Sequence, residues 1–166
     1  MKKVFLAACL FALSLPLTLV GQNATEQLKD YTQLMPGNGI ELTLIHINPK
    51  TAAVLFQPPT LYQMRARSTA TTMLYVQGEV KKDVEFDSTN FTLTQGSDSL
   101  TGKPSNISHF EKAKLSKGTR VDGILDFGKT IDLSKPFTIK HGPKDSAEFK
   151  FTEAQVASMA PAAAAK

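Results

Sequence analysis

Residues 117–127 read KGTRVDGILDF, and this stretch decides the fold class. Val121, Leu125 and Phe127 fall on one face of an extended chain, while two aspartates fall on the other. Apolar and polar residues that alternate with a period of two predict a strand with one buried face. Gly118 stands where the chain must turn into that strand.

The same period of two recurs on both sides of this strand. The expected strands cover residues 40–47, 52–56, 72–81, 91–94, 121–127, 137–139 and 147–151. Turn residues separate most of them, and residues 60–71 fit a strand, a loop or a helical turn equally. Short alternating strands of this kind predict an all-β chain with one antiparallel β-sandwich over residues 39–152.

Three stretches within residues 72–151 also carry a family resemblance. They are DSTNFTL at 87–93, KGTRVDGILDF at 117–127, and FTIK at 137–140 followed by AEFKF at 147–151. These stretches resemble a family of bacterial immunoglobulin-like domains of unknown function, found in secreted and envelope lipoproteins. The resemblance implies an immunoglobulin-like sandwich, and it implies no catalytic residue.

The beginning of the chain predicts export. Lys2 and Lys3 precede a long apolar run that ends at Gly21, which is the order of a secretory signal peptide over residues 1–21. Cleavage after Ala24 is the alternative. The short basic leader is typical of bacteria, so we expect a periplasmic or extracellular protein. No later stretch is long and apolar enough to predict a transmembrane segment.

Cys9 raises the alternative of a lipid anchor. Leu6-Ala7-Ala8-Cys9 matches the lipobox of bacterial lipoproteins. However, the apolar run continues beyond Cys9, where a lipoprotein turns polar, so we expect the unlipidated form. Cys9 is also the one cysteine of the chain, and its removal with the leader excludes disulfides and thiolate metal sites.

Two segments flank the predicted sandwich. Apolar residues recur at three-to-four spacing in residues 24–35, which predicts a short amphipathic helix and turn within residues 22–38. Residues 153–166 are rich in alanine and contain a proline, and we expect a flexible tail there.

Composition and motifs exclude several classes of function. The chain has 19 Lys and Arg against 15 Asp and Glu, without a basic block, so nucleic acid is not an expected partner. The sequence has no nucleophile elbow, phosphate-cradling loop or dinucleotide fingerprint. We therefore expect neither an enzyme nor a cofactor.

A metal site is the alternative hypothesis. Its candidate ligands are three histidines and three alternating carboxylates: His46, His109 and His141, and Asp83, Glu85 and Asp87. The histidines lack the close spacing of common zinc motifs, although distant residues could still assemble a copper or zinc site. The carboxylates share one face if their segment is a strand, and oxygen clusters suit calcium.

A candidate contact patch for a partner consists of Tyr62, Met64, Arg65 and Arg67, although a solvated strand face fits the same pattern.

We expect a non-catalytic exported module of the bacterial cell envelope that docks to another protein. The edges of an open sandwich and the two flanks are its expected contact elements. An envelope or surface protein is the expected partner, with self-assembly and a carbohydrate ligand left open. The alternative is a small periplasmic protein that binds copper, zinc or calcium.

Overall fold

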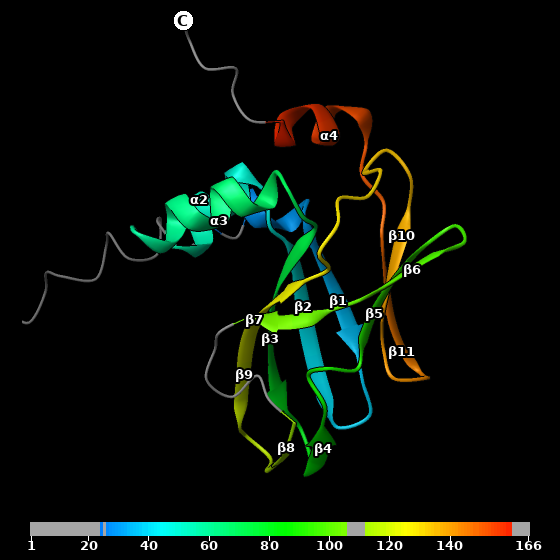
Figure 1. Cartoon of the computed structure of the whole chain (residues 1–166). Coiled ribbons are helices and arrows are strands. Elements are labelled where there is room, and N and C mark those ends of the chain that lie inside the picture. The colour runs from blue at the N-terminus through cyan, green and yellow to red at the C-terminus, as the bar shows by residue number, and fades with distance from the viewer. Residues whose placement is uncertain (1–23, 25, 106–111, 161–166) are drawn as a thin grey trace, which may run out of the picture.

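A computed structural model describes residues 24, 26–105 and 112–160. The chain is mostly β, with antiparallel sheets and helices gathered at one end (Figure 1). The strands are β1 (Thr32–Pro36), β2 (Ile40–His46), β3 (Met73–Val80), β4 (Val84–Phe86), β5 (Phe91–Gln95), β6 (Asp98–Thr101), β7 (Lys103–Ser105), β8 (Ala113–Leu115), β9 (Arg120–Asp126), β10 (Phe137–His141) and β11 (Asp145–Phe149). The helices are α2 (Pro49–Leu55), α3 (Thr60–Ser68) and α4 (Glu153–Met159).

Two larger sheets enclose the main core. One has the strand order β1-β2-β3-β9-β7, the other has the order β11-β10-β5-β6, and β4 pairs with β8 alone. All of these pairs are antiparallel. Buried side chains of both larger sheets belong to one apolar cluster, as a β-sandwich requires.

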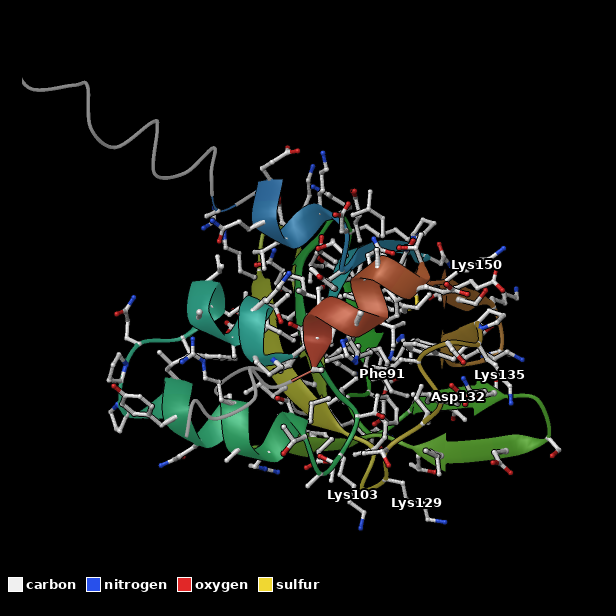
Figure 2. All side chains as sticks on the ribbon, turned by 90° about the horizontal axis from the view of Figure 1, so that it is seen from above. Phe91, Lys103, Lys129, Asp132, Lys135 and Lys150 are labelled. Carbon is white, nitrogen blue, oxygen red and sulfur yellow. The ribbon has the colours of Figure 1, made fainter. Side chains whose placement is uncertain are left out.

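The alternating pattern decides which side chains are inside. The apolar side chains that the alternation places on the inner face are buried in that cluster: Phe91, Leu93, Val121, Leu125, Phe127, Ile139, Phe149 and Phe151. Phe137 and Phe149 lie opposite each other on β10 and β11, and their rings stack with centroids 5.0 Å apart. Figure 2 shows Phe91 inside the molecule and Lys103, Lys129 and Lys150 extending away from it.

A close approach of two strands explains the glycine in β3. Gly78 pairs with Leu42 of β2, and a Cβ atom at Gly78 would stand 2.5 Å from the Glu41 carbonyl oxygen. No side chain fits that space without movement of the backbone. Gly118 has φ +86°, in agreement with the turn predicted before β9.

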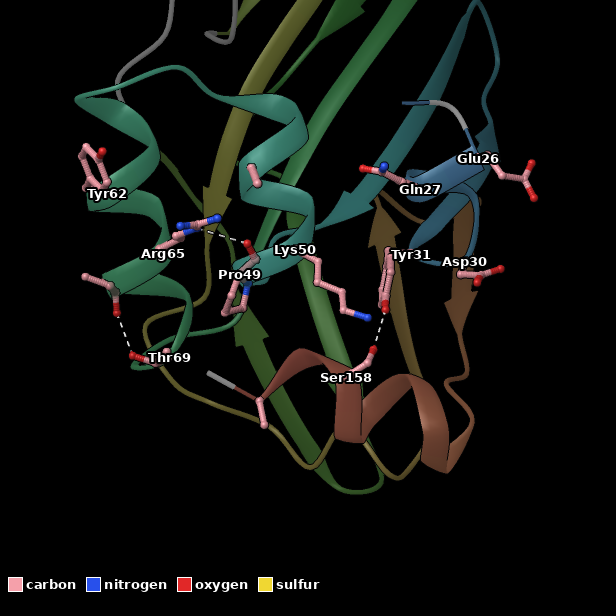
Figure 3. A pocket seen from close by; sticks show the side chains of 13 residues that line it. Glu26, Gln27, Asp30, Tyr31, Pro49, Lys50, Tyr62, Arg65, Thr69 and Ser158 are labelled. Atoms are coloured by element: carbon pink, nitrogen blue, oxygen red, sulfur yellow. Dashed lines mark hydrogen bonds between the residues drawn. The ribbon is translucent and has the colours of Figure 1, made fainter. Parts of the chain in front are cut away.

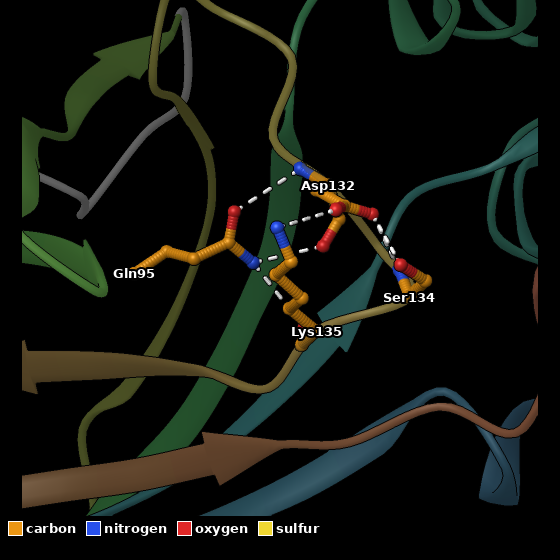
Figure 4. A network of polar contacts seen from close by, with 4 residues as sticks. All are labelled: Gln95, Asp132, Ser134 and Lys135. Atoms are coloured by element: carbon orange, nitrogen blue, oxygen red, sulfur yellow. Dashed lines mark hydrogen bonds and ion pairs between the residues drawn. The ribbon is translucent and has the colours of Figure 1, made fainter.

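The connection from β9 to β10 is held by Gln95 (Figure 4). The Gln95 side-chain amide donates to the carbonyl oxygens of Asp132 (2.8 Å) and Lys135 (3.2 Å), and its oxygen accepts from Asp132 N at 3.1 Å. The Asp132 carboxylate accepts from Ser134, which lowers the pKa of Asp132, and it also pairs with Lys135. One side chain of β5 therefore fixes the loop that passes from one sheet to the other.

The strand predicted over residues 52–56 is wrong, because this segment belongs to α2. The Asn48 side chain accepts from Lys50 N (2.9 Å) and Thr51 N (3.2 Å), and Pro49 stands at the start of the helix. The ambiguous residues 60–71 contain α3. These two helices pack on the outer face of the five-stranded sheet and bury a second apolar cluster, which consists of Ile47, Ala52, Met64, Met73 and Ile124.

Both predicted flanks differ from the structure. Residues 26–29 are helical, but Thr32–Pro36 is strand β1 rather than the second half of a helix. The turn after Pro36, closed by Gly37 N donating to Ile40 O at 2.9 Å, makes a hairpin with β2. The burial of neighbouring side chains agrees with a strand, since Met35 is buried and Leu34, the residue before it, is 61% exposed.

The first part of the predicted tail is helix α4. The Thr152 hydroxyl accepts from Gln155 N at 3.2 Å, and Gln155 Oε1 accepts from Thr152 N at 2.7 Å. This capping box starts the helix, and Met159 is buried against the sandwich core.

Residues 1–21, Cys9, His109 and residues 161–166 lie outside the described residues. The predictions that concern them therefore stay predictions. None of the helices within the described residues combines the length and apolar character that a membrane crossing requires.

Candidate functional site

The most prominent concavity lies at the helical end of the molecule (Figure 3). It is a cleft of about 1110 Å³ between the α2–α3 pair on one side and the N-terminal turn and α4 on the other. Its lining consists of Glu26, Gln27, Asp30, Tyr31, Pro49, Lys50, Ala53, Tyr62, Arg65, Ala66, Thr69, Ser158 and Ala160. Three parts of the chain that are far apart in sequence therefore build one site.

The α2–α3 pair forms a wall of small, aromatic and cationic residues. Ala53 and Ala66 keep the cleft open, and Tyr62 is 63% exposed beside them. Lys50 follows the proline that begins α2, so the cap at the start of that helix also sets the position of its side chain. This wall is positioned by the second apolar cluster beneath it.

Tyr31 and α4 form the opposite side. The Tyr31 hydroxyl lies 2.8 Å from Ser158 Oγ, which in turn donates to the Gln155 carbonyl oxygen of its own helix at 2.7 Å. The Tyr31 ring packs on Phe151 with centroids 6.0 Å apart, and Gln155 Nε2 donates to Asp30 O at 3.4 Å. α4 is thus fixed to the segment that precedes β1.

Charge is unevenly distributed around the cleft. Lys50 and Arg65 make no ion pair within the described residues, and the Arg65 Nε donates to Pro49 O at 3.3 Å. Residues 42–78, which include both helices of this wall, contain no Asp or Glu. The acidic residues of the lining, Glu26 and Asp30, stand on the other side, where Glu26 pairs with Lys29.

The structure places the four residues of the predicted contact patch in three different environments. Tyr62 and Arg65 line the cleft, whereas Met64 is buried beneath it in the second apolar cluster. Arg67 points to β9 and forms an ion pair with Asp126 at 2.5 Å. Partial burial alone would raise the pKa of Asp126, but the Gly128 N–H and the Arg67 guanidinium hold it below its ordinary value.

His46 and His141, the two predicted histidine ligands within the described residues, do not meet. His46 packs against Phe137, the first residue of β10, whereas His141 is the last residue of that strand. Four residues of extended chain span about 13 Å, so the two rings cannot share one ion. Within the described residues no group of three His, Cys, Asp or Glu side chains is placed to hold a metal.

The environments of these two histidines explain this arrangement. His46 is 3% exposed, and burial lowers its pKa to about 4, so the ring is neutral in the folded protein. His141 lies against the Phe91 ring, with centroids 4.4 Å apart, and its Nε2 donates to Asp87 O at 3.0 Å. Both rings are packing residues of the sandwich.

The three candidate carboxylates are engaged separately. Asp83 accepts from Lys117 N at 2.9 Å. Asp87 accepts from the Thr89 hydroxyl at 2.6 Å and from Thr89 N at 3.0 Å, and these bonds lower the pKa of Asp87. Glu85 is exposed on β4. Asp83 and Asp87 lie just outside the ends of that strand, and the three carboxylates are not placed to hold a metal ion together.

Sequence reasoning missed Tyr31, Lys50 and Ser158. Asn48 followed by Pro49 was the available signal for Lys50, because this pair marks the start of a helix. Nothing local indicates that Tyr31 and Ser158 meet, since 127 positions separate them.

Comparison of the chain with family models, with curated proteins and with solved structures found no match. The site is therefore interpreted from its own geometry.

Proposed function

We propose that this protein is a non-catalytic, exported binding module of the bacterial cell envelope. It docks to another protein through the cleft at its helical end. We also propose that its sandwich is immunoglobulin-like, as the resemblance of residues 72–151 implies. The metal-binding alternative stays a prediction without a supporting contact.

The strand order supports an immunoglobulin-like fold. Immunoglobulin constant domains place strands A, B, E and D in one sheet and C, F and G in the other. If β2, β3, β5, β6, β7, β9, β10 and β11 are lettered A, B, C, C′, D, E, F and G, the larger sheets have the orders A-B-E-D and C′-C-F-G. β1 extends the first sheet beyond strand A. A core rich in phenylalanine takes the place of the disulfide and tryptophan of antibody domains.

One observation carries the docking proposal: the cleft combines exposed aromatic surface with two cations that make no ion pair within the described residues. Tyr62 and Arg65 are of the residue types that contribute most to protein interfaces. Small residues such as Ala66 leave room for a segment of another protein. The Ser158 hydroxyl bonds Tyr31 and its own helix rather than a general base, which supports a binding role over a catalytic one.

The sheet edges are less suited to docking than the cleft. β6 and β7, which form one edge of each sheet, have only four and three residues. The opposite edges, β1 and β11, have five residues each and contact each other. Short edges offer few backbone hydrogen bonds to an added strand. We therefore place the contact at the helices rather than at an edge.

In-cell photo-crosslinking tests this proposal. A photoreactive residue at Ala66, in the cleft wall, should yield a discrete cross-linked product with another envelope protein. The same residue at Lys114, exposed on β8 at the other end of the sandwich, is the matched control. The docking proposal is wrong if Ala66 gives no product at native expression, or if both positions give the same products.

A further inference from the structure

We propose that the segment bound in this cleft is an acidic peptide of the partner, whose carboxylates pair with Lys50 and Arg65. This inference rests on the proposed docking function and adds the chemistry of the partner. It also assigns the two walls of the cleft different roles.

The first step is the direction of the two cations. Figure 3 shows the Lys50 ammonium extending from α2 into the cleft toward Tyr31 and Ser158. Arg65 reaches from α3 to the Pro49 carbonyl, which accepts from its Nε at 3.3 Å. Within the described residues no hydrogen bond engages the terminal guanidinium nitrogens. A guanidinium offers two parallel N–H groups that match a carboxylate. The wall therefore presents two positive charges that a partner can neutralise.

The second step concerns what else lines the cleft. Glu26 and Asp30 stand on the far side of the cleft, and Figure 3 shows their carboxylates extending outward, away from the cationic wall. An acidic segment is therefore attracted to the α2–α3 side. We expect the carboxylates of the partner peptide to lie along α2–α3. Backbone N–H groups or basic residues of the partner should lie on the side of Asp30. An apolar side chain between two acidic ones would cover Ala53 and Ala66.

The third step distinguishes an acidic peptide from a phosphate ligand. Phosphate groups favour the free N–H groups at the start of a helix. Here Asn48 already bonds the N–H groups of Lys50 and Thr51, and α2 is a short helix. A nucleic acid would also need a continuous series of cations, whereas the lining of this cleft has two. Carboxylates are the better match.

The fourth step concerns the source of the acidic side chains. Residues 1–23 and 161–166 contain no Asp or Glu. Although Ala160 lies at the rim, residues 161–166 carry no side chain that complements Lys50 and Arg65. We therefore assign the acidic side chains to a partner molecule.

Selection from a displayed library of random ten-residue peptides tests the inference without knowledge of the partner. The protein purified from expressing cells is compared with the Lys50→Glu/Arg65→Glu variant. Lys114→Glu/Lys117→Glu, on exposed residues at the far end of the sandwich, is a control with the same change in charge. Lys50→Glu alone, which leaves the Arg65–Pro49 bond intact, is the second variant, and circular dichroism checks that each variant is folded.

We expect the unmodified protein and the control to select peptides with an excess of Asp and Glu. Binding of those peptides should weaken about tenfold or more in both cleft variants. Selection of neutral or basic peptides, equal binding by the cleft variants, or no selection at all would overturn the inference. The inference would also be overturned if inorganic phosphate displaced the selected peptides while chloride at the same ionic strength did not. If cross-linking from Ala66 persists in Lys50→Glu, docking stands and the acidic chemistry alone fails.

Discussion

Acid should destabilise this protein through one buried histidine. His46 ends β2, and its ring packs on Phe151 with centroids 5.3 Å apart. Its Nδ1 has no hydrogen-bond partner, and burial is what lowers the pKa to about 4. The backbone N–H of His46 donates to Tyr31 O at 2.9 Å, and its carbonyl accepts from the Thr51 hydroxyl at 2.8 Å. A charge on this ring would therefore arise beneath the cleft.

The size of the effect follows from the two pKa values of this side chain. The unfolded chain protonates His46 near its ordinary value of 6.5, whereas the folded protein resists protonation until about pH 4. Between these values the unfolded state binds more protons, so the free energy of unfolding falls as the pH falls. Each pH unit in that window is worth about 1.4 kcal/mol. The expected loss from His46 is therefore about 3 kcal/mol by pH 4, and the contribution is fully present above pH 6.5.

Urea unfolding at a series of pH values between 7 and 4 measures this loss. The chain has no Trp, so circular dichroism should follow the transition. His46→Leu removes the titrating group and should flatten the pH dependence in this window, because the unpartnered Nδ1 disappears with it. His141→Gln, at the far end of β10, is the matched control and should keep the full dependence. Equal slopes for His46→Leu and the unmodified protein would refute the reasoning.

Three further substitutions test the packing and capping described above, all measured as the free energy of urea unfolding at pH 7. Phe127→Ala should cost about 3–5 kcal/mol, since it empties a buried site in the sandwich core, and a near-neutral effect would contradict that core. Gly78→Ala should also destabilise, because its Cβ would stand 2.5 Å from the Glu41 carbonyl oxygen; unchanged stability would mean that the strands separate easily. Asn48→Ala should cost about 0.5–2 kcal/mol through loss of the α2 cap, whereas Asn48→Asp should keep most of it.

The sandwich was predictable from sequence because alternation records burial directly. Val121, Leu125 and Phe127 point inward in β9, as their spacing indicates. Residues 52–56 were assigned to a strand because a short apolar run looks the same in a buried strand and in a helix. The cap at Asn48 decides between the two, and it stands before the run rather than within it.

The cleft was less predictable, because its walls meet only after folding. Tyr62 and Arg65 were identified from their own sequence neighbourhood, which is one helix. Arg67, two positions later, faces Asp126 instead, since a helix turns successive residues in different directions. The contact between Tyr31 and Ser158 depends on β1 and α4 being brought together by the sandwich, and no local pattern reports it.

The two apolar clusters share no buried residue, and this separation has an evolutionary consequence. α2 and α3 are inserted between β2 and β3, and the second apolar cluster lies beneath them. Mutations on their outward face can therefore accumulate while the β scaffold keeps its stability. Under the docking function proposed above, the insert would be an interchangeable recognition element, and grafting a different helical pair between His46 and Met73 would be a direct way to give the same scaffold a new partner.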